Sequence, residues 1–537
     1  MAPIFVGSNN EDSRIRSNRI GFAASTADPG SADEGDGYYN ITDNQLKLSD
    51  GSAFSAISGG GGTVELVASG SLSNGQTVIV QSDGTVTAVA ATTNNVGSRV
   101  TFESANTSYT NAVFDSNSNR IVIAYQDNGN SAYGTAVVGT VSGETISFGT
   151  PVVFASAVVV YLDITFDSIN NKVVITYTDG GNNDYGTAIV GNVDPSDNSI
   201  SFGNSAVFES ATAYYTNSTF DSNSGKVVIG YRDDGVSPYR PTVVVGTVSG
   251  TSITFGTPVT VSTIQGSQCH PIFDPSNNKV LIAYNDETNS KGYAKVGTVS
   301  GNSISLGAAV QFENASVSHF DTVFDSTNNK VVIVYRDGGN SNNGTAVVGE
   351  IDGIFVTFGT PVVFDTGTAA HMRAAYDSRN NKIVIGFYDD ANFDLGYVIS
   401  GTVSGDHTNS TITFGTRINF ADQGRAWYIG AAYDSSNERV VFSYEDDYDN
   451  DYGKAFVFRN AGTNLTSENF IGFSDADYTN GQTAKIQIVS SIDDAQTGLT
   501  TGSLHYVQND GSLGVAASTP SVVAGTAISG TKISIKN

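Results

Sequence analysis

The sequence predicts an all-β chain whose central part is a seven-bladed β-propeller with four-stranded blades. An aromatic residue and an aspartate, followed by a polar turn and a β-branched run, occur seven times, with 51 to 57 residues between successive aspartates. A period of about fifty residues filled with short strands is typical of propeller blades. The 59 glycines and the charged fraction of 15% also favour β structure. The seven pairs are Phe114-Asp115, Phe166-Asp167, Phe220-Asp221, Phe273-Asp274, Phe324-Asp325, Tyr376-Asp377 and Tyr433-Asp434.

Each copy predicts four strands, which we name a to d. In the second copy, residues 163–166, 172–177 and 185–191 are strands a, b and c, and turns rich in Asp, Asn and Gly separate them. Residues 145–154 illustrate strand d and contain the sequence Phe-Gly-Thr-Pro. Because proline has no amide hydrogen, strand d suits the outer edge of a blade. Strand a is then expected to line the central axis.

The ends of the repeat region predict how the propeller closes. The seventh copy has a strand c at residues 452–458, but no Phe-Gly-Thr-Pro strand follows it. An orphan segment, residues 97–104, precedes the first copy and ends in Phe-Glu-Ser, like the strand d that ends at Ser210. We therefore expect residues 97–104 to complete the seventh blade, which would remove an unpaired sheet edge.

Four regions are predicted along the chain. Residues 1–62 form an N-terminal attachment segment that ends in a glycine-rich joint, and residues 97–470 form the propeller. Residues 63–96 and 471–537 are each expected to form a small β module. These two flanks share an Asn-Gly-Gln-Thr segment, and Asn-Gly is a strong hairpin signal.

Composition excludes several classes of protein. Lys and Arg number 26 against 53 Asp and Glu, a formal net charge of −27, and a field of this sign repels nucleic acid. The single cysteine, Cys269, allows no intrachain disulfide. No apolar run approaches the length of a membrane span, about 18 residues. The first residues lack a classical signal sequence, so neither membrane insertion nor classical export is expected.

Residues 35–54, GDGYYNITDNQLKLSDGSAF, form a predicted strand pair around an Asp-Asn turn. This segment resembles a short module near the N-terminus of many marine bacteriophage virion proteins and tail fibres. The C-terminal module, with His505-Tyr506-Val507, is similar to modules at the ends of other phage structural proteins. The resemblance implies a protein of the virion, made in the host cytoplasm, whose N-terminal segment binds other virion proteins. It also hints at a homotrimer, since fibres are commonly trimers.

Positions that vary among the copies are candidates for function. We call the position five residues before each aromatic–Asp pair the rim position, and we expect it at the mouth of the central channel. It is occupied by Tyr109, Tyr161, Tyr215, Gln268, His319, His371 and Tyr428. Two residues further on, the side chains are expected to line the channel because strand side chains alternate. These are Asn111, Asp163, Asn217, His270, Asp321, Arg373 and Gly430. Tyr214 and Trp427 stand beside the rim position.

Two interpretations of the rim are open. The aromatic side chains could simply fill the funnel, with their polar tips in water. Alternatively they form a glycan or peptide site, with ring faces that stack on sugars and polar groups that bind hydroxyls. The candidate ligand-binding residues are Tyr109, Tyr161, Tyr214, Tyr215, His319, His371, Trp427 and Tyr428.

Metal and catalytic sites are not expected. Asp447, Asp449 and Asp451 alternate as in a calcium loop, but the glycine and the glutamate of such a loop are missing. They remain a weak calcium candidate. The carboxylates of Asp163 and Asp321 come from blades that are not neighbours, and the turns depart from the Ser-x-Asp-x-Gly-x-x-aromatic turn of sialidase propellers. We therefore expect no cofactor, no catalytic residue and no enzyme activity.

The sequence thus favours a tail fibre or adhesin whose propeller recognises a glycan or protein on the host surface. A purely structural capsid, neck or tail fibre protein, with the propeller as a spacer, is the first alternative. A glycan depolymerase is the second.

Overall fold

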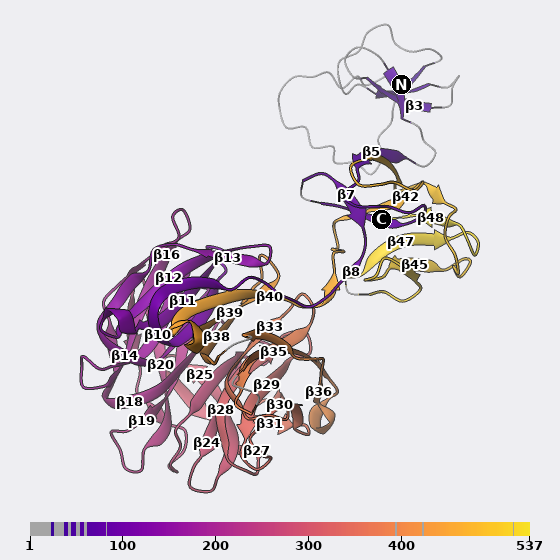
Figure 1. Ribbon diagram of the computed structural model, residues 1–537. Helices are drawn as coiled ribbons and strands as arrows, with labels where there is room; N and C mark the ends of the chain where they lie inside the picture. The colour runs from indigo at the N-terminus through magenta and orange to yellow at the C-terminus, as the bar shows by residue number, and fades with distance from the viewer. Residues whose placement is uncertain are drawn as a thin grey trace. The chain divides into compact units, whose positions relative to one another are not determined.

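The structure, a computed structural model, describes residues 62–81, 83–391, 395–421, 424–518 and 520–536, and the backbone of four short strands between residues 23 and 57. The predicted all-β class is confirmed: the described residues form strands and three short 3₁₀ segments, without an α-helix (Figure 1). Where the chain is described, no helix has the length and hydropathy to cross a membrane. The chain divides into two compact units, Thr93–Ala461 and Met1–Thr92 with Gly462–Asn537.

The larger unit repeats one antiparallel arrangement seven times. Its first strands are β10 (Val100–Asp115), β14 (Val152–Asp167), β18 (Ala206–Asp221), β23 (Cys269–Asp274), β28 (Val317–Asp325), β33 (Ala369–Asp377) and β38 (Ala426–Asp434). Its second strands are β11 (Arg120–Asp127), β15 (Lys172–Asp179), β19 (Lys226–Asp233), β24 (Lys279–Asp286), β29 (Lys330–Asp337), β34 (Lys382–Asp389) and β39 (Arg439–Asp446). Its third strands are β12 (Tyr133–Ser142), β16 (Tyr185–Asp194), β20 (Arg240–Ser249), β25 (Lys291–Ser300), β30 (Asn343–Asp352), β35 (Leu395–Ser404) and β40 (Tyr452–Arg459).

The outer edge of each repeat consists of two pieces, both paired with the third strand. The first pieces are β13 (Thr145–Phe148), β17 (Ser199–Phe202), β21 (Ser252–Phe255), β26 (Ser303–Leu306), β31 (Phe355–Phe358), β36 (Thr411–Phe414) and β9 (Asn95–Val96). The second pieces are β22 (Val259–Thr260), β27 (Val310–Glu313), β32 (Val362–Asp365), β37 (Ile418–Ala421) and the opening residues of β10, β14 and β18.

The break in this outer strand corrects the prediction of one continuous strand over residues 145–154. β13 ends at Phe148, and β14 begins at Val152 after Gly149, Thr150 and Pro151. Pro151 has no amide hydrogen to donate to the ladder. Gly149 lies so close to the next repeat that an added Cβ would be 2.3 Å from the carbonyl oxygen of Asn198. The chain therefore bends here and does not extend the ladder.

The seven first strands follow one another in a cyclic order. Each contacts the first strand of the next repeat, and β38 contacts β10. β10 also pairs with the third strand of the last repeat, with Val100 opposite Ala455 and Thr101 opposite Lys454. The outer edge of the seventh repeat therefore comes from the beginning of the repeat region.

In six repeats a phenylalanine of the outer strand packs on a buried aromatic ring in the second strand of the following repeat. Phe102 is 7% exposed, and its ring centroid lies 5.2 Å from that of Tyr125. The corresponding pair between the fifth and sixth repeats, Phe364 and Phe387, lies 5.2 Å apart. The second strands that carry the inner rings are almost wholly buried. They are rich in Val and Ile, which pack well on pleated sheets.

The smaller unit differs from the two separate flanking modules that the sequence predicts. One sheet has the order β5 (Thr63–Val67), β43 (Thr483–Gln487), β42 (Phe470–Ser474), β6 (Thr77–Val80), β7 (Val86–Ala88). This sheet thus combines strands from both flanks, because a module of about 30 residues alone buries too little apolar surface. A second sheet has the order β44 (Ile492–Asp493), β48 (Ile533–Ile535), β47 (Val522–Ala527), β45 (Leu504–Val507), β46 (Leu513–Gly514). β8 (Ala91–Thr92) pairs with β41 (Gly462–Thr463).

The segment that resembles virion proteins contains paired strands. β2 (Gly37–Asn40) pairs antiparallel with β3 (Gln45–Ser49), and β3 pairs with β4 (Phe54–Ile57). β1 (Ala23–Ser25) runs parallel to β2. The expected Asp-Asn turn at residues 41–44 lies outside the described residues.

Candidate functional site

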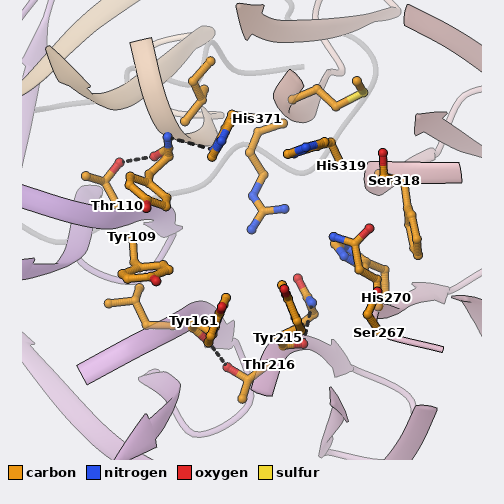
Figure 2. A pocket seen from close by; sticks show the side chains of 18 residues that line it. Tyr109, Thr110, Tyr161, Tyr215, Thr216, Ser267, His270, Ser318, His319 and His371 are labelled. Atoms are coloured by element: carbon orange, nitrogen blue, oxygen red, sulfur yellow. Dashed lines mark hydrogen bonds between the residues drawn. The ribbon is translucent and has the colours of Figure 1, made fainter. Parts of the chain in front are cut away.

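A cavity of about 290 Å³ lies among the first strands of the larger unit (Figure 2). All seven rim-position side chains line it, so the structure brings together residues whose successive spacings along the chain are 51 to 57 positions. The lining also includes Asn217, His270 and Arg373 of the predicted channel layer. The rim residues are half-buried, which leaves part of each side chain accessible.

Six rim side chains form a continuous arc of ring contacts. The centroid distances are 4.3 Å for Tyr215–Tyr161, 5.1 Å for Tyr161–Tyr109, 4.6 Å for Tyr109–Tyr428, 5.1 Å for Tyr428–His371 and 5.1 Å for His371–His319. Gln268, from the fourth repeat, occupies the seventh position. Aromatic and imidazole rings therefore surround most of the cavity, and the amide of Gln268 completes the circle.

The backbone at these six positions is left-handed. The φ angle is between 47° and 53° at Tyr109, Tyr161, Tyr215, His319, His371 and Tyr428. In each case the pairing with the second strand shifts register there, for example between Ser108 and Asn111. Such a bulge usually has glycine at the left-handed residue, and a bulky residue there costs about 1–3 kcal/mol. The chain keeps six rings at this cost.

The bulge also brings residues into the cavity that alternation does not predict. The residue after the rim position lines the cavity in six repeats: Thr110, Leu162, Thr216, Phe320, Met372 and Ile429. Two of these fix the strands to their neighbours, because the hydroxyl of Thr110 donates to the carbonyl of Tyr428 and that of Thr216 to the carbonyl of Tyr161, both at 2.6 Å. No glycine or other sequence signal marks these bulges.

We expect Tyr161→Gly to unfold at a higher temperature than Tyr161→Ala. Both variants lose the same ring, but glycine adopts positive φ freely, whereas alanine at positive φ costs about 1–2 kcal/mol. Thermal melts of the two variants measure the difference. Leu162, whose φ is not positive, serves as the control, and there the alanine variant should be the more stable. An alanine variant at 161 that equals or exceeds the glycine variant would contradict the strained backbone.

Charged groups meet beside the cavity floor. The guanidinium nitrogens of Arg373 lie 3.7 Å from Asp321 Oδ1 and 4.0 Å from Asp163 Oδ1. His270 Nδ1 lies 3.7 Å from Asp321 Oδ1. Asp163 does not line the cavity itself, and it accepts hydrogen bonds from Asn111 and from the amide and hydroxyl of Ser218. Five residues of the predicted channel layer thus form one network around Arg373, whereas Asn217 donates to the carbonyl of Tyr215 outside it.

Two polar atoms of the lining are without a hydrogen-bond partner. They are Nε of Arg373 and Oε1 of Gln268, and both are buried. A buried polar group without a partner is costly, and neither atom is accessible from the cavity. A ligand there can contact only the exposed remainder of the two half-buried side chains.

Burial determines the protonation of the lining. It lowers the pKa of His319 to about 4 and, together with the nearby His319 and Arg373, that of His371 to about 3. It also raises the pKa of Tyr109 to about 12. Burial raises the pKa of Asp163 to about 6 against the effect of Arg373. At neutral pH the rim therefore consists of neutral rings.

Tyr214 and Trp427 lie next to the lining and are not part of it. The ring of Tyr214 contacts Tyr161 at 5.4 Å, and Arg232 lies 5.0 Å from its centroid. Trp427 contacts His371 edge-on at 4.8 Å. Both side chains therefore support rim residues from outside the cavity.

Glu445 is a buried acid that the sequence comparison did not identify. It lies opposite Trp427 in the β38–β39 pair, is 8% exposed and accepts a hydrogen bond from Ser108 Oγ at 3.2 Å. Burial, and then the charge of Asp451, raise its pKa to about 8.

We expect Glu445→Gln to raise the melting temperature at pH 8–9 and to leave it nearly unchanged at pH 4. A carboxyl group whose pKa is raised on folding binds its proton more tightly in the folded state, so wild-type stability falls as pH rises from about 4.3, the unfolded pKa, through the folded pKa. Glutamine cannot ionise and removes this fall. Melts across pH 4 to 9 measure it, and parallel curves for the two proteins would contradict the buried acid.

The acidic loop of the seventh repeat is held by contacts within the protein. Asp449 lies in η3 (Asp447–Asp449) and forms an ion pair with Lys454. Asp451 accepts a hydrogen bond from Asn106 at 2.7 Å. Throughout the described part of the chain, no three His, Cys, Asp or Glu side chains are grouped so that they could hold a metal ion.

No protein family model and no curated protein matches the sequence. Solved structures that match include the NanB sialidase from Streptococcus pneumoniae, at 11% identity over 67% of this chain and 69% of that chain, with a TM-score of 0.40. Trypanosoma rangeli sialidase in complex with the inhibitor DANA matches at 12% identity over 74% of this chain and 60% of that chain, with a TM-score of 0.35. A mutant of AofleA from Arthrobotrys oligospora matches at 9% identity over 64% of this chain and 94% of that chain, with a TM-score of 0.39.

These matches contradict the expectation that the chain is not an enzyme, because the first two are structures of sialidases. We withdraw that expectation. At these identities and TM-scores the matches assign no substrate and no catalytic residue to this chain, and the site rests on its own geometry.

Proposed function

We propose that the larger unit is a seven-bladed β-propeller whose central cavity binds a carbohydrate. The arc of six rim rings around a polar floor is the observation that carries this proposal. Sugars combine apolar ring faces with hydroxyl groups, and sites that bind them pair aromatic side chains with a few fixed polar groups. The cyclic order of the first strands supports the propeller.

The size of the cavity favours a single sugar unit. Pockets for small ligands measure about 300–1,000 Å³, and the value here, about 290 Å³, is just below that range. A terminal residue of a glycan would fit better than an extended peptide. The exposed parts of the Arg373 guanidinium and of the Gln268 amide would bind its hydroxyls.

Backbone strain at the rim supports a binding role. Strained residues persist where the surrounding structure holds them, and they cluster at ligand sites. Rings that only filled the funnel could be supplied from unstrained positions. Six repeats nevertheless place a tyrosine or histidine on a left-handed residue.

We further propose that this chain is a bacteriophage virion appendage and that glycan binding attaches the particle to its host. The resemblance of residues 35–54 to virion proteins supports this part of the proposal. Immunogold electron microscopy of particles with an antibody to the larger unit tests it. Labelled fibres or tail tips are expected, whereas unlabelled particles would contradict it.

Binding to purified host surface polysaccharide and to a glycan array tests the carbohydrate site. We expect saturable binding that a matching free monosaccharide inhibits. The length of the polysaccharide after incubation, measured by size-exclusion chromatography, decides whether binding is accompanied by cleavage. Absence of binding to every glycan would contradict the proposal and favour a structural spacer.

A further inference from the structure

The connection between an outer strand and the next first strand is longest between the third and fourth repeats. There the outer strand β22 has only two residues, and residues 261–268 connect it to β23 without strand structure. In the first two repeats the corresponding segment continues directly into the next first strand, as in β14 and β18. This long connection leaves space beside β24 and β25.

A second cavity, of about 460 Å³, occupies this space. Its lining includes the hydroxyl residues Thr260, Ser262 and Thr263, and the rings of Tyr284 and Tyr293, which stack at 5.9 Å with an interplanar angle of 23°. It shares no lining residue with the central cavity.

The same cavity contains a lysine where the other repeats have an aliphatic or aromatic side chain. Lys295 occupies the fifth position of β25, which is taken elsewhere by Val137, Ile189, Val244, Val347, Ile399 and Phe456. Its ammonium group donates to the carbonyl oxygen of Val261 at 2.7 Å. Among the described residues no carboxylate lies within 4.0 Å of this nitrogen. Burial lowers the pKa of Lys295.

A partly buried ammonium without a counter-charge is an unusual choice for this position. Charged groups in protein interiors are normally paired, because removal from water is costly. A valine would avoid that cost and would also match the other repeats. The lysine therefore leaves a positive charge, with hydrogen-bonding capacity to spare, facing a cavity of mainly hydroxyl groups. The one carboxylate in the lining, that of Asp286, accepts hydrogen bonds from the amide and the side chain of Asn289.

We propose that this second cavity binds an acidic sugar of the uronic acid type, with its carboxylate on Lys295. The threonine and serine hydroxyls would bind the sugar hydroxyls, and the exposed part of the Tyr293 ring would cover one sugar face. The charge on Lys295 selects the carboxylate, and the hydroxyl lining selects a polyhydroxylated ligand over a simple acid.

Titration of the full chain with D-glucuronate, D-glucose and acetate, followed by ligand-observed NMR, tests this site. Glucuronate is expected to bind, and glucose and acetate are expected to bind at least about tenfold more weakly. Glucose lacks the hydrogen bond to the charged group, worth about 1.5–3 kcal/mol, and acetate lacks the hydrogen bonds of the sugar hydroxyls, worth about 0.5–1.5 kcal/mol each. Equal binding of glucose would overturn the role of the carboxylate, and equal binding of acetate would overturn the role of the sugar.

Two variants locate the binding. Lys295→Val restores the residue of the other repeats, so the fold should persist, and we expect it to weaken glucuronate binding by about tenfold or more. Lys291→Val removes a lysine from the same strand outside the cavity and should leave binding unchanged. Unchanged glucuronate binding by Lys295→Val, with an unchanged melting temperature, would overturn the proposal.

Discussion

Phe102→Ala is expected to destabilise the larger unit as strongly as Phe364→Ala, by about 3–5 kcal/mol, the usual cost of removing a buried phenylalanine. Phe102 precedes the first repeat in the chain, yet it packs on Tyr125 as Phe364 packs on Phe387. Both rings are almost buried, at 7% and 8% exposed. If β10 closes the seventh repeat, Phe102 contributes as much to the free energy of unfolding as a phenylalanine of an internal repeat.

Urea denaturation midpoints of the two variants, with tyrosine fluorescence or far-UV circular dichroism as the signal, measure this equality. Ile169→Ala, at an exposed turn residue, is the control and should have little effect. A Phe102→Ala midpoint close to that of the control would mean that the start of the repeat region contributes little to the unit and would contradict closure.

Tyr428→Asn is expected to weaken glycan binding by about 1–3 kcal/mol, the range for aromatic residues at the centre of a binding site. Tyr428 joins the two halves of the arc, because its ring contacts both Tyr109 and His371. Asparagine tolerates a left-handed backbone, so this variant removes the ring and keeps the bulge.

Isothermal titration with the monosaccharide found in the inhibition assay measures this loss. Asn329→Gly, in the turn between β28 and β29, keeps a positive φ and should bind as the wild type does. Trp427→Ala should have a smaller effect than Tyr428→Asn, because Trp427 lies outside the lining. If Tyr428→Asn bound the glycan with wild-type affinity, the rim would not be part of the binding site.

The sequence predicted features that depend on repetition. The second strands, such as residues 172–177, were recognisable because β-branched runs follow each polar turn, and the structure places them in β15 and its equivalents. Comparison of equivalent positions also selected the seven side chains that the structure gathers around one cavity. Spacing alone sufficed, since equivalent positions in successive repeats face a common centre.

Features that break the repeat could not be predicted in this way. The left-handed residues at the rim are tyrosines and histidines, not the glycines that mark such bulges, so alternation placed Thr110 and Met372 away from the cavity. The pairing of β6 with β42 joins residues about 390 positions apart, and no local pattern encodes it. The sequence alone did not indicate a role for Lys295, because the cavity that it lines forms beside the connection after β22.

The structure of the protein in complex with its glycan would test most directly whether the central cavity binds a carbohydrate. We expect a sugar ring in this cavity, in contact with the arc formed by Tyr109, Tyr161 and Tyr428, with a hydroxyl within hydrogen-bond distance of Arg373. A glycan bound elsewhere on the larger unit, with only water in the central cavity, would contradict carbohydrate binding there.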